Sequence, residues 1–318
     1  MTAPGPGTIG PDQAQPAWVL PLVLSGVLCF AVSAILVRYA SAAPGLAVAA
    51  LRTSIAIVIL APVGIPATIR AWRGLGARDV GLIVIAGALL GVHFVVWISS
   101  IYYTSVASAA VLVATGPIFM GVFGFLFLGE KLSRRTTVAI VVAVAGSVIL
   151  GLADSESHAP IDGKPMLGNA LALFAAVLWA LYLLIGRVVR RRVDWLPYVF
   201  PLYVVAGVTT LAFAIGSGTP LDGYPTIVYV MCLAMALLPQ ILGHGSFNYA
   251  VKFYPAAFLG LVSLLEPIGA AALGLFLFHE RPGPMAYVGM ALILVAVGST
   301  LAFPEGAASE VEPPMATD

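Results

Sequence analysis

The sequence predicts an all-α membrane protein with ten transmembrane helices, arranged as two inverted repeats of five helices each. Three observations lead to this fold class. Of the 318 residues, 61% are hydrophobic and only 9% are charged, whereas a soluble domain is about 45–50% apolar and about 25% charged. The apolar residues form ten long stretches, and the two halves of the chain can be aligned with each other. So few charged residues cannot cover a water-soluble protein of this length.

Each apolar stretch is long enough to cross a bilayer as a helix, which requires about 20 mainly apolar residues. Glycine, proline or polar residues interrupt the second, third, seventh and eighth stretches, so the ends of these four are less sharply defined. The ten predicted spans cover residues 18–37, 45–66, 80–99, 107–128, 136–153, 166–186, 198–216, 226–248, 256–278 and 285–303.

The segments outside the spans have a different composition. Residues 1–17 are rich in proline and glycine and contain no Lys or Arg, and residues 304–318 are acidic, so both are predicted to be disordered cytoplasmic tails. Residues 154–165 are expected to form a periplasmic or extracellular linker between the first repeat, 18–153, and the second, 166–303. A signal peptide would carry a basic start and a shorter apolar core, so we expect the first span to be retained.

The basic residues predict the orientation. With both termini in the cytoplasm, eleven Lys and Arg residues fall in cytoplasmic loops and three in outer loops, as the positive-inside rule requires. We therefore expect a multi-pass protein of the cytoplasmic (inner) membrane. The eleven are Arg70, Arg73, Arg78, Lys131, Arg134, Arg135, Arg187, Arg190, Arg191, Arg192 and Lys252, and the three are Arg38, Lys164 and Arg281.

The two halves align without a gap over their fourth and ninth spans. An offset of 150 residues places 107–130 on 257–280, with Pro117 on Pro267 and Glu130 on Glu280. An odd number of spans in each half turns the second copy upside down in the membrane. Inverted repeats of this kind are typical of transporters, which bind their substrate near the bilayer midplane between the halves and alternate its access.

Short motifs in both halves resemble the EamA repeat of the drug/metabolite transporter superfamily, and the resemblance covers about residues 18–303. It implies a ten-span carrier, and many members of that family export amino acids, other small metabolites or toxic compounds. His279 departs from the glycine that is usual before the glutamate. The motifs are His244-Gly-Ser-Phe-Asn248-Tyr-Ala-Val-Lys252, Leu264-Leu-Glu266-Pro267 and His279-Glu280-Arg281, and in the first half Ala50-Leu51-Arg52, Thr115-Gly116-Pro117 and Leu128-Gly129-Glu130-Lys131.

Glu266 is the acidic residue in the middle of a span; the other thirteen lie in tails, loops or span ends. A charged side chain at that depth costs on the order of 2.5–3.5 kcal/mol, so burial favours the neutral, proton-carrying form. We predict a site for a substrate ammonium group or a proton. The alternative is a structural, protonated side chain that is hydrogen-bonded to a neighbouring helix.

Three prolines within the spans, Pro117, Pro239 and Pro267, are predicted to break the helical hydrogen bonding. The carbonyl groups that they release need partners or must line a wet cavity. We therefore expect hinges or cavity walls at these positions. A simple structural kink is the alternative for each of them.

Polar and aromatic side chains on several spans are expected to face the same cavity. Gln240, His244 and Asn248 are spaced four residues apart and would share one face of an α-helix, and the third span presents His93 and Trp97. Arg52 is a candidate anion contact or a partner for Glu266, unless it snorkels to the headgroups. Trp179 and Tyr182 would suit a flat or apolar substrate, although packing is an alternative for them, as hydrogen bonding in the core is for the histidines. The predicted substrate-binding set is Arg52, His93, Trp97, Trp179, Tyr182, Gln240, His244, Asn248 and Glu266.

Charged pairs follow the fourth and ninth spans, at opposite membrane faces. Glu130 with Lys131, and Glu280 with Arg281, are either interfacial anchors or gates whose contacts differ between the inward- and outward-open states.

Several classes of function are excluded or disfavoured. A net charge of +1 and the absence of a basic patch argue against nucleic-acid binding. No catalytic motif, metal-ligand spacing or cofactor motif is present, so an enzyme is not expected. We predict an alternating-access carrier that moves a small organic metabolite, such as an amino acid, across the membrane, with export favoured. A channel-like pore or uniporter is the alternative, and proton coupling and the choice between monomer and homodimer stay open.

Overall fold

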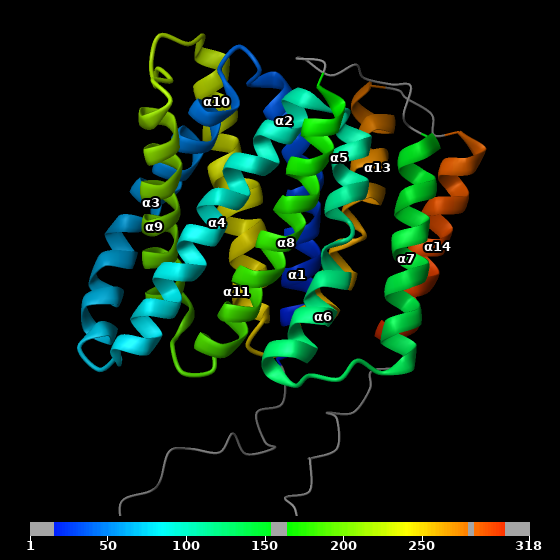
Figure 1. The fold of residues 1–318 in the computed structure, drawn as a ribbon, viewed down its shortest axis with the longest axis horizontal. Coiled ribbons are helices and arrows are strands. Elements are labelled where there is room, and N and C mark those ends of the chain that lie inside the picture. The colour runs from blue at the N-terminus through cyan, green and yellow to red at the C-terminus, as the bar shows by residue number, and fades with distance from the viewer. Residues whose placement is uncertain (1–15, 154–163, 279–282, 303–318) are drawn as a thin grey trace, which may run out of the picture.

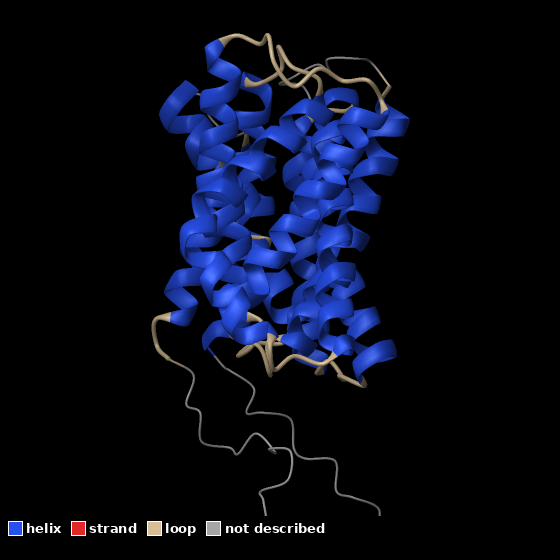
Figure 2. Cartoon of the chain, turned by 90° about the vertical axis from the view of Figure 1, so that its left-hand side faces the viewer, coloured by secondary structure: helices blue, strands red, loops and turns tan. Residues whose placement is uncertain are grey.

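The computed structural model describes residues 16–153, 164–278 and 283–302. Within these ranges the chain is helical and contains no strand. The helices run side by side as one bundle, with the loops gathered at its two ends (Figures 1 and 2). The elements are α1 (Val19–Ala31), α2 (Ser33–Tyr39), α3 (Gly45–Trp72), α4 (Ala77–Tyr103), α5 (Val106–Val113), α6 (Gly116–Leu128), α7 (Arg134–Ala153), α8 (Pro165–Val189), α9 (Trp195–Gly216), α10 (Thr226–Met235), the π-helix η1 (Ala236–His244), α11 (Gly245–Ala250), α12 (Ala256–Ser263), α13 (Glu266–Phe278) and α14 (Pro284–Ala302).

Nine helical segments in the described part of the chain are long and apolar enough to cross a membrane. They overlap nine of the ten predicted spans. The remaining predicted span, 136–153, coincides with α7, which is 20 residues long but is not one of the nine. A tenth span therefore stays a prediction. The nine segments are Val19–Tyr39, Gly45–Trp72, Ala77–Tyr103, Ser108–Leu128, Pro165–Val189, Trp195–Gly216, Thr226–Ala250, Ala256–Leu273 and Pro284–Ala302.

Two of these segments are interrupted halfway along. The helix α5 stops at Val113 and α6 restarts at Gly116, while α12 stops at Ser263 and α13 restarts at Glu266. Pro117 and Pro267 each occupy the second position of the new helix, where a missing N–H group is tolerated because first-turn donors have no intrahelical partner. The sequence predicted that both prolines would disturb the helix, and the structure has a break directly before each.

Close contact between helix backbones depends on glycine at two places where bulkier residues would collide. A methyl group on Gly87 of α4 would lie 2.7 Å from the carbonyl oxygen of Leu202 on α9. A methyl group on Gly146 of α7 would lie 2.7 Å from the carbonyl oxygen of Gly289 on α14. Small residues let membrane helices approach in this way and gain dispersion energy. The pair α7 and α14 lies side by side at one edge of the bundle (Figure 1).

The helix α1 begins, and α14 ends, at the same end of the bundle (lower end of Figure 1). We call this the terminal end and the other the distal end. The predicted tails, 1–17 and 304–318, and the predicted linker, 154–165, lie outside the described residues except for the few positions at their borders.

Candidate functional site

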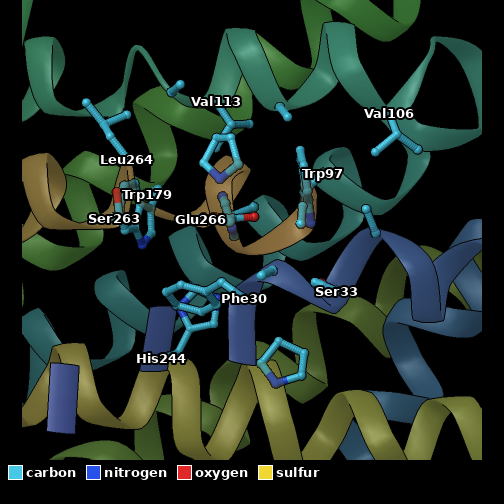
Figure 3. Close-up of a pocket in the computed structure, with 18 of the residues that line it drawn as sticks. Phe30, Ser33, Trp97, Val106, Val113, Trp179, His244, Ser263, Leu264 and Glu266 are labelled. Carbon is cyan, nitrogen blue, oxygen red and sulfur yellow. The ribbon is translucent and has the colours of Figure 1, made fainter. Parts of the chain in front are cut away.

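A cavity of about 90 Å³ lies inside the bundle (Figure 3). Residues of α1 to α5, α8, η1, α12 and α13 surround it, together with Ala114 and Leu264 of the two helix breaks. Its wall reaches Val106, the first residue of α5, which begins at the distal end (Figure 1). The cavity therefore extends from the interior toward the distal end. Its polar and aromatic lining consists of Ser33, Arg52, His93, His244, Ser263 and Glu266, and of Phe30, Phe94, Trp97 and Trp179.

Glu266 reaches the cavity because the helix is broken at that point. It is the first residue of α13, after Leu264 and Leu265, which belong to neither helix. In Figure 3 it lies on the same side of the cavity as Trp97 and Trp179, facing Phe30 and His244. No cation of the described residues pairs with Glu266 within 4 Å. The nearby Ser263 hydroxyl donates to the Gly260 carbonyl oxygen of its own helix at 2.6 Å.

Arg52 brings the opposite charge to the same cavity. Its side chain is only 1% exposed, so it does not snorkel to the headgroups. Its Nε donates to Gln240 Oε1 at 3.1 Å, and its Cζ lies 4.4 Å from the centre of the Phe94 ring. Within the described residues its Nη2 has no hydrogen-bond partner, and no carboxylate, that of Glu266 included, pairs with it. A buried guanidinium without an anion is a strong candidate for an anion site.

The two histidines on the predicted list lie together. The ring centres of His93 and His244 are 5.8 Å apart. His93 Nδ1 lies 2.9 Å from the carbonyl oxygen of Ala175, which can only accept, so this nitrogen carries the proton. His244 Nδ1 lies 2.8 Å from the Tyr182 hydroxyl, and its ring meets Phe94 edge to face. Tyr182 is fully buried and orients His244 rather than lining the cavity itself.

The expectation that Gln240, His244 and Asn248 form one stripe facing the cavity was wrong for two of the three. Only His244 lines it, whereas Gln240 and Asn248 are fully buried beside it. The reason is that residues 236–244 form a π-helix, whose hydrogen bonds run from residue i to i+5. Within it a spacing of four residues no longer places Gln240 and His244 on one face, whereas Asn248 lies beyond it in the α-helix α11. Gln240 holds Arg52 instead, and Asn248 Nδ2 donates to the His244 carbonyl oxygen at 2.8 Å.

The three predicted hinge prolines have different surroundings. Pro267 and Pro239 line the cavity. Pro117 does not line it and packs against α12, where a methyl group on Gly260 would lie 3.1 Å from the Pro117 Cα atom.

A cluster of contacts lies at the terminal end around Arg187, the last basic residue of α8. Its Nε donates to Glu130 Oε1 at 3.0 Å, just after α6. Its Nη1 donates to the carbonyl oxygens of Val251 and Tyr254, at 3.1 and 3.0 Å, in the linker from α11 to α12. One side chain thus ties three segments together, and we call these contacts the Arg187 clamp. Arg191 lies 3.9 Å from the same carboxylate oxygen.

Sequence reasoning assigned Arg187 only to topology and did not find its role in the clamp. It lies at the C-terminal end of a span, close to Arg190, and this position gave only a weak signal. No ion pair is recorded for Lys131 in the described part of the chain, and Glu280 and Arg281 lie outside the described residues.

Arg190 supports the same end of the bundle from the loop after α8. Its Nε donates to the Asn248 carbonyl oxygen at 3.0 Å, and its Nη1 donates to the Val193 carbonyl oxygen. Burial lowers the pKa of the Arg190 guanidinium to about 10. It stays charged at neutral pH and satisfies one carbonyl group of α11 and one of its own loop.

Comparison with known proteins relates this chain to transporters. The sequence profile of the EamA-like transporter family matches residues 17–152 and again residues 166–302. The threonine/homoserine exporter RhtA of Escherichia coli is 29% identical over 266 residues, which cover 81% of this chain and 82% of RhtA. A probable terminal-alkyne amino-acid exporter of Streptantibioticus cattleyicolor is 25% identical over 259 residues, covering 77% and 80%. A crystal structure with 19% identity has the same fold, with a TM-score of 0.72 over 91% of this chain and 98% of the other.

Proposed function

Because the chain belongs to the EamA-like transporter family of the drug/metabolite transporter superfamily, we propose that it is an alternating-access carrier that exports a small zwitterionic metabolite of the amino-acid type. The protein is a multi-pass membrane transporter of small molecules and not an enzyme. What is proposed is the mechanism, the chemistry of the substrate and the direction of transport.

The observation that carries the proposal is the presence of two opposite, unpaired ionisable groups in one cavity. Glu266 and Arg52 both line it, and neither has a counter-charge within 4 Å among the described residues. Removing the partner of a buried charge is strongly unfavourable, so each group favours a ligand of the opposite sign. A zwitterion supplies both, with its carboxylate at Arg52 and its ammonium at Glu266. The relatives that are named as exporters of threonine, homoserine or an alkyne amino acid support the same class of substrate.

The remaining lining residues fit the side chain of such a substrate. Phe30, Trp97 and Trp179 give the cavity an apolar, aromatic wall, and aromatic faces also attract an ammonium group. His93 and His244 add hydrogen-bonding groups. Within this proposal Gln240 fixes the guanidinium of Arg52, Tyr182 fixes His244, and Asn248 supports the backbone at His244.

A proton is a further candidate for Glu266 when no substrate is bound. A carboxyl group without a countercharge in an apolar wall favours its neutral form. Exchange of a proton for the substrate ammonium would couple export to the proton gradient. Facilitated diffusion requires no such exchange, and a pH gradient in the assay below distinguishes the two.

The proposed membrane arrangement is ten spans in two inverted repeats, with α7 as the fifth span and both termini in the cytoplasm. An even number of crossings requires the chain to begin and end on one side, and the start of α1 and the end of α14 at the terminal end are consistent with this. The positive-inside count supports the assignment of that side to the cytoplasm. The breaks before Pro117 and Pro267 would be the hinges, since discontinuous helices of inverted-repeat carriers lie at the binding site.

The Arg187 clamp would be the cytoplasmic gate in this arrangement. It ties α8 to the end of α6 and to the start of α12, which are the terminal-end halves of the two broken helices. The cavity reaches toward the distal end, so this conformation is closed to the cytoplasm. Release of the clamp would allow the cytoplasmic halves to separate. Glu130 is the acidic member of the proposed gate.

The proposal is tested by counterflow in liposomes that contain the purified full-length protein. Vesicles loaded with unlabelled threonine should accumulate radiolabelled threonine, and the flux should saturate. Two analogues serve as competitors, threonine amide, which lacks the carboxylate, and the corresponding dihydroxy acid, which lacks the ammonium group. We expect each to compete at least about tenfold more weakly, because each leaves one buried charge unpaired.

Three results would contradict the proposal. Competition by both analogues as strong as that by threonine itself would rule out the zwitterion site. Flux that does not saturate, together with the absence of counterflow, would indicate a pore instead of a carrier. No accumulation of any of the twenty standard amino acids would reject the substrate class.

A further inference from the structure

A groove of about 360 Å³ lies between α7 and α14, the pair of helices at one edge of the bundle. It is separate from the central cavity, which no residue of α7 or α14 lines. Its floor consists of two buried alanines, Ala139 and Ala296, which are 4% and 3% exposed. Valines form its walls, and Val138 and Val295 are 61% and 68% exposed.

The sequence explains the shape of the groove. The backbones of α7 and α14 approach each other closely at Gly146 and Gly289. Toward the terminal end the facing residues are alanines, which are too small to fill the space between the helices. Branched residues flank them, with Val138 next to Ala139 and Val295 next to Ala296 in the sequence. The result is an apolar channel along the outside of the bundle, which faces the hydrocarbon of the membrane if α7 is the fifth span, as proposed above.

Two arginines stand at the terminal end of this groove. Arg134 and Arg135 are the first two residues of α7, are exposed, and line the groove together with Ser299 of α14. The first turn of a helix carries a partial positive charge and N–H groups without intrahelical partners. The Ser133 hydroxyl satisfies one of these groups, the N–H of Thr136, at 3.1 Å. Two guanidinium groups and a helix start thus place positive charge where an apolar groove meets the headgroup region.

We propose that this groove binds one molecule of anionic phospholipid. Its phosphate lies at Arg134 and Arg135, and one acyl chain lies over Ala139 and Ala296 between the valines. Charge complementarity identifies the headgroup, because basic pockets between membrane helices select anionic over zwitterionic lipids. The apolar groove identifies a lipid rather than a free phosphate ion, which would gain nothing from Val138 and Val295.

The test measures lipid binding and does not depend on transport. Purified full-length protein in detergent is titrated with phosphatidylglycerol and, separately, with phosphatidylcholine of the same acyl chains, and the bound lipids are counted by native mass spectrometry. The double variant Arg134→Gln/Arg135→Gln removes the charge. The matched control, Arg70→Gln/Arg73→Gln, removes the same charge from exposed positions at the end of α3, outside the groove.

The expected result is a loss of roughly 30-fold in phosphatidylglycerol affinity for the double variant, about fivefold for each arginine. Phosphatidylcholine, whose headgroup has no net charge, should lose clearly less affinity than phosphatidylglycerol, and the control should stay within about twofold of the wild type. A second variant, Ser299→Phe, obstructs the groove without changing charge and should weaken both lipids.

The proposal fails if Arg134→Gln/Arg135→Gln and the control Arg70→Gln/Arg73→Gln lower phosphatidylglycerol affinity equally, because the attraction would then be a property of the whole face. It also fails if Ser299→Phe leaves both lipids bound as before. Inorganic phosphate in the millimolar range should not displace the lipid, and displacement would show that the arginines bind a free anion. Monodispersity of each variant on gel filtration excludes misfolding as the cause.

Discussion

The two broken helices have the same interruption but different residues at it. Each breaks two residues before a proline, and the residue directly before the proline is Glu266 in α12–α13 and Gly116 in α5–α6. Glu266 lines the cavity, whereas the space beside Gly116 belongs to Trp179, since a methyl group there would lie 2.9 Å from the indole ring. The same backbone break therefore places an ionisable side chain in the cavity in α12–α13 and creates a packing contact in α5–α6.

The largest effect is expected for Glu266→Gln, which keeps the size of the side chain and removes its charge. Loss of a charged hydrogen bond to the substrate ammonium costs about 1.5–3 kcal/mol, or roughly 10- to 150-fold. Threonine counterflow at low substrate concentration should fall by that factor. Ser263→Ala, a change to a lining hydroxyl that is already bonded within its own helix, should stay within about twofold. Normal counterflow by Glu266→Gln would mean that the two breaks do not differ in function.

The next effect concerns Arg52, which supplies the charge opposite to that of Glu266. Arg52→Lys retains a cation but loses the planar fork that binds a carboxylate and contacts Phe94. We expect KM for threonine to rise about tenfold, equivalent to about 1.4 kcal/mol, with a smaller change in maximal flux. Concentration-dependent counterflow separates the two quantities. An unchanged KM would remove Arg52 from the binding site.

Gly116→Ala should lower the stability of the protein, because Trp179 leaves too little space for the added methyl group. The added methyl group requires the indole to shift, and overpacking of this kind costs about 1–3 kcal/mol. The free energy of unfolding in detergent should fall by that amount. The control is Gly81→Ala in α4, where no atom lies within 4 Å of the added methyl group and alanine favours the helix. If both variants are equally stable, Trp179 does not restrict the first break.

The smallest effect is expected at the Arg187 clamp, because Glu130 is 24% exposed and such ion pairs contribute about 0.2–1 kcal/mol. Glu130→Gln should increase labelling of a Ser263→Cys probe from the terminal end by up to about fivefold, in a chain with Cys29→Ala and Cys232→Ala. Lys131→Gln, which removes a neighbouring charge without an observed ion pair, should not change it. Equal labelling by a membrane-impermeant maleimide in all three chains would exclude a gate at this place.

Much of the architecture could be predicted because its physical cause is visible in composition. Apolar stretches of helix length gave the positions of the nine segments, and proline gave the two breaks. Glu266, Arg52 and His244 could be singled out because an ionisable or polar residue within an apolar stretch needs a reason. The presence of these three in one cavity follows from tertiary packing between helices that are up to 214 positions apart in the chain.

Two features had no reliable signal in the sequence. The π-helix at 236–244 has no residue-type signature, and Pro239 indicates a disturbance but not its kind. The prediction for Gln240 failed for that reason. The Arg187 clamp uses carbonyl oxygens of Val251 and Tyr254, and a backbone acceptor gives no residue-type signal. Arg187 was therefore indistinguishable from the arginines that follow it.

The most direct test of the zwitterion site combines the charge variant with the substrate analogues. In the wild type, the dihydroxy acid should compete with threonine at least about tenfold more weakly than threonine itself. In Glu266→Gln this difference should disappear, while threonine amide should remain a poor competitor because Arg52 is unchanged. If the difference between threonine and the dihydroxy acid is as large in Glu266→Gln as in the wild type, Glu266 does not bind the ammonium group.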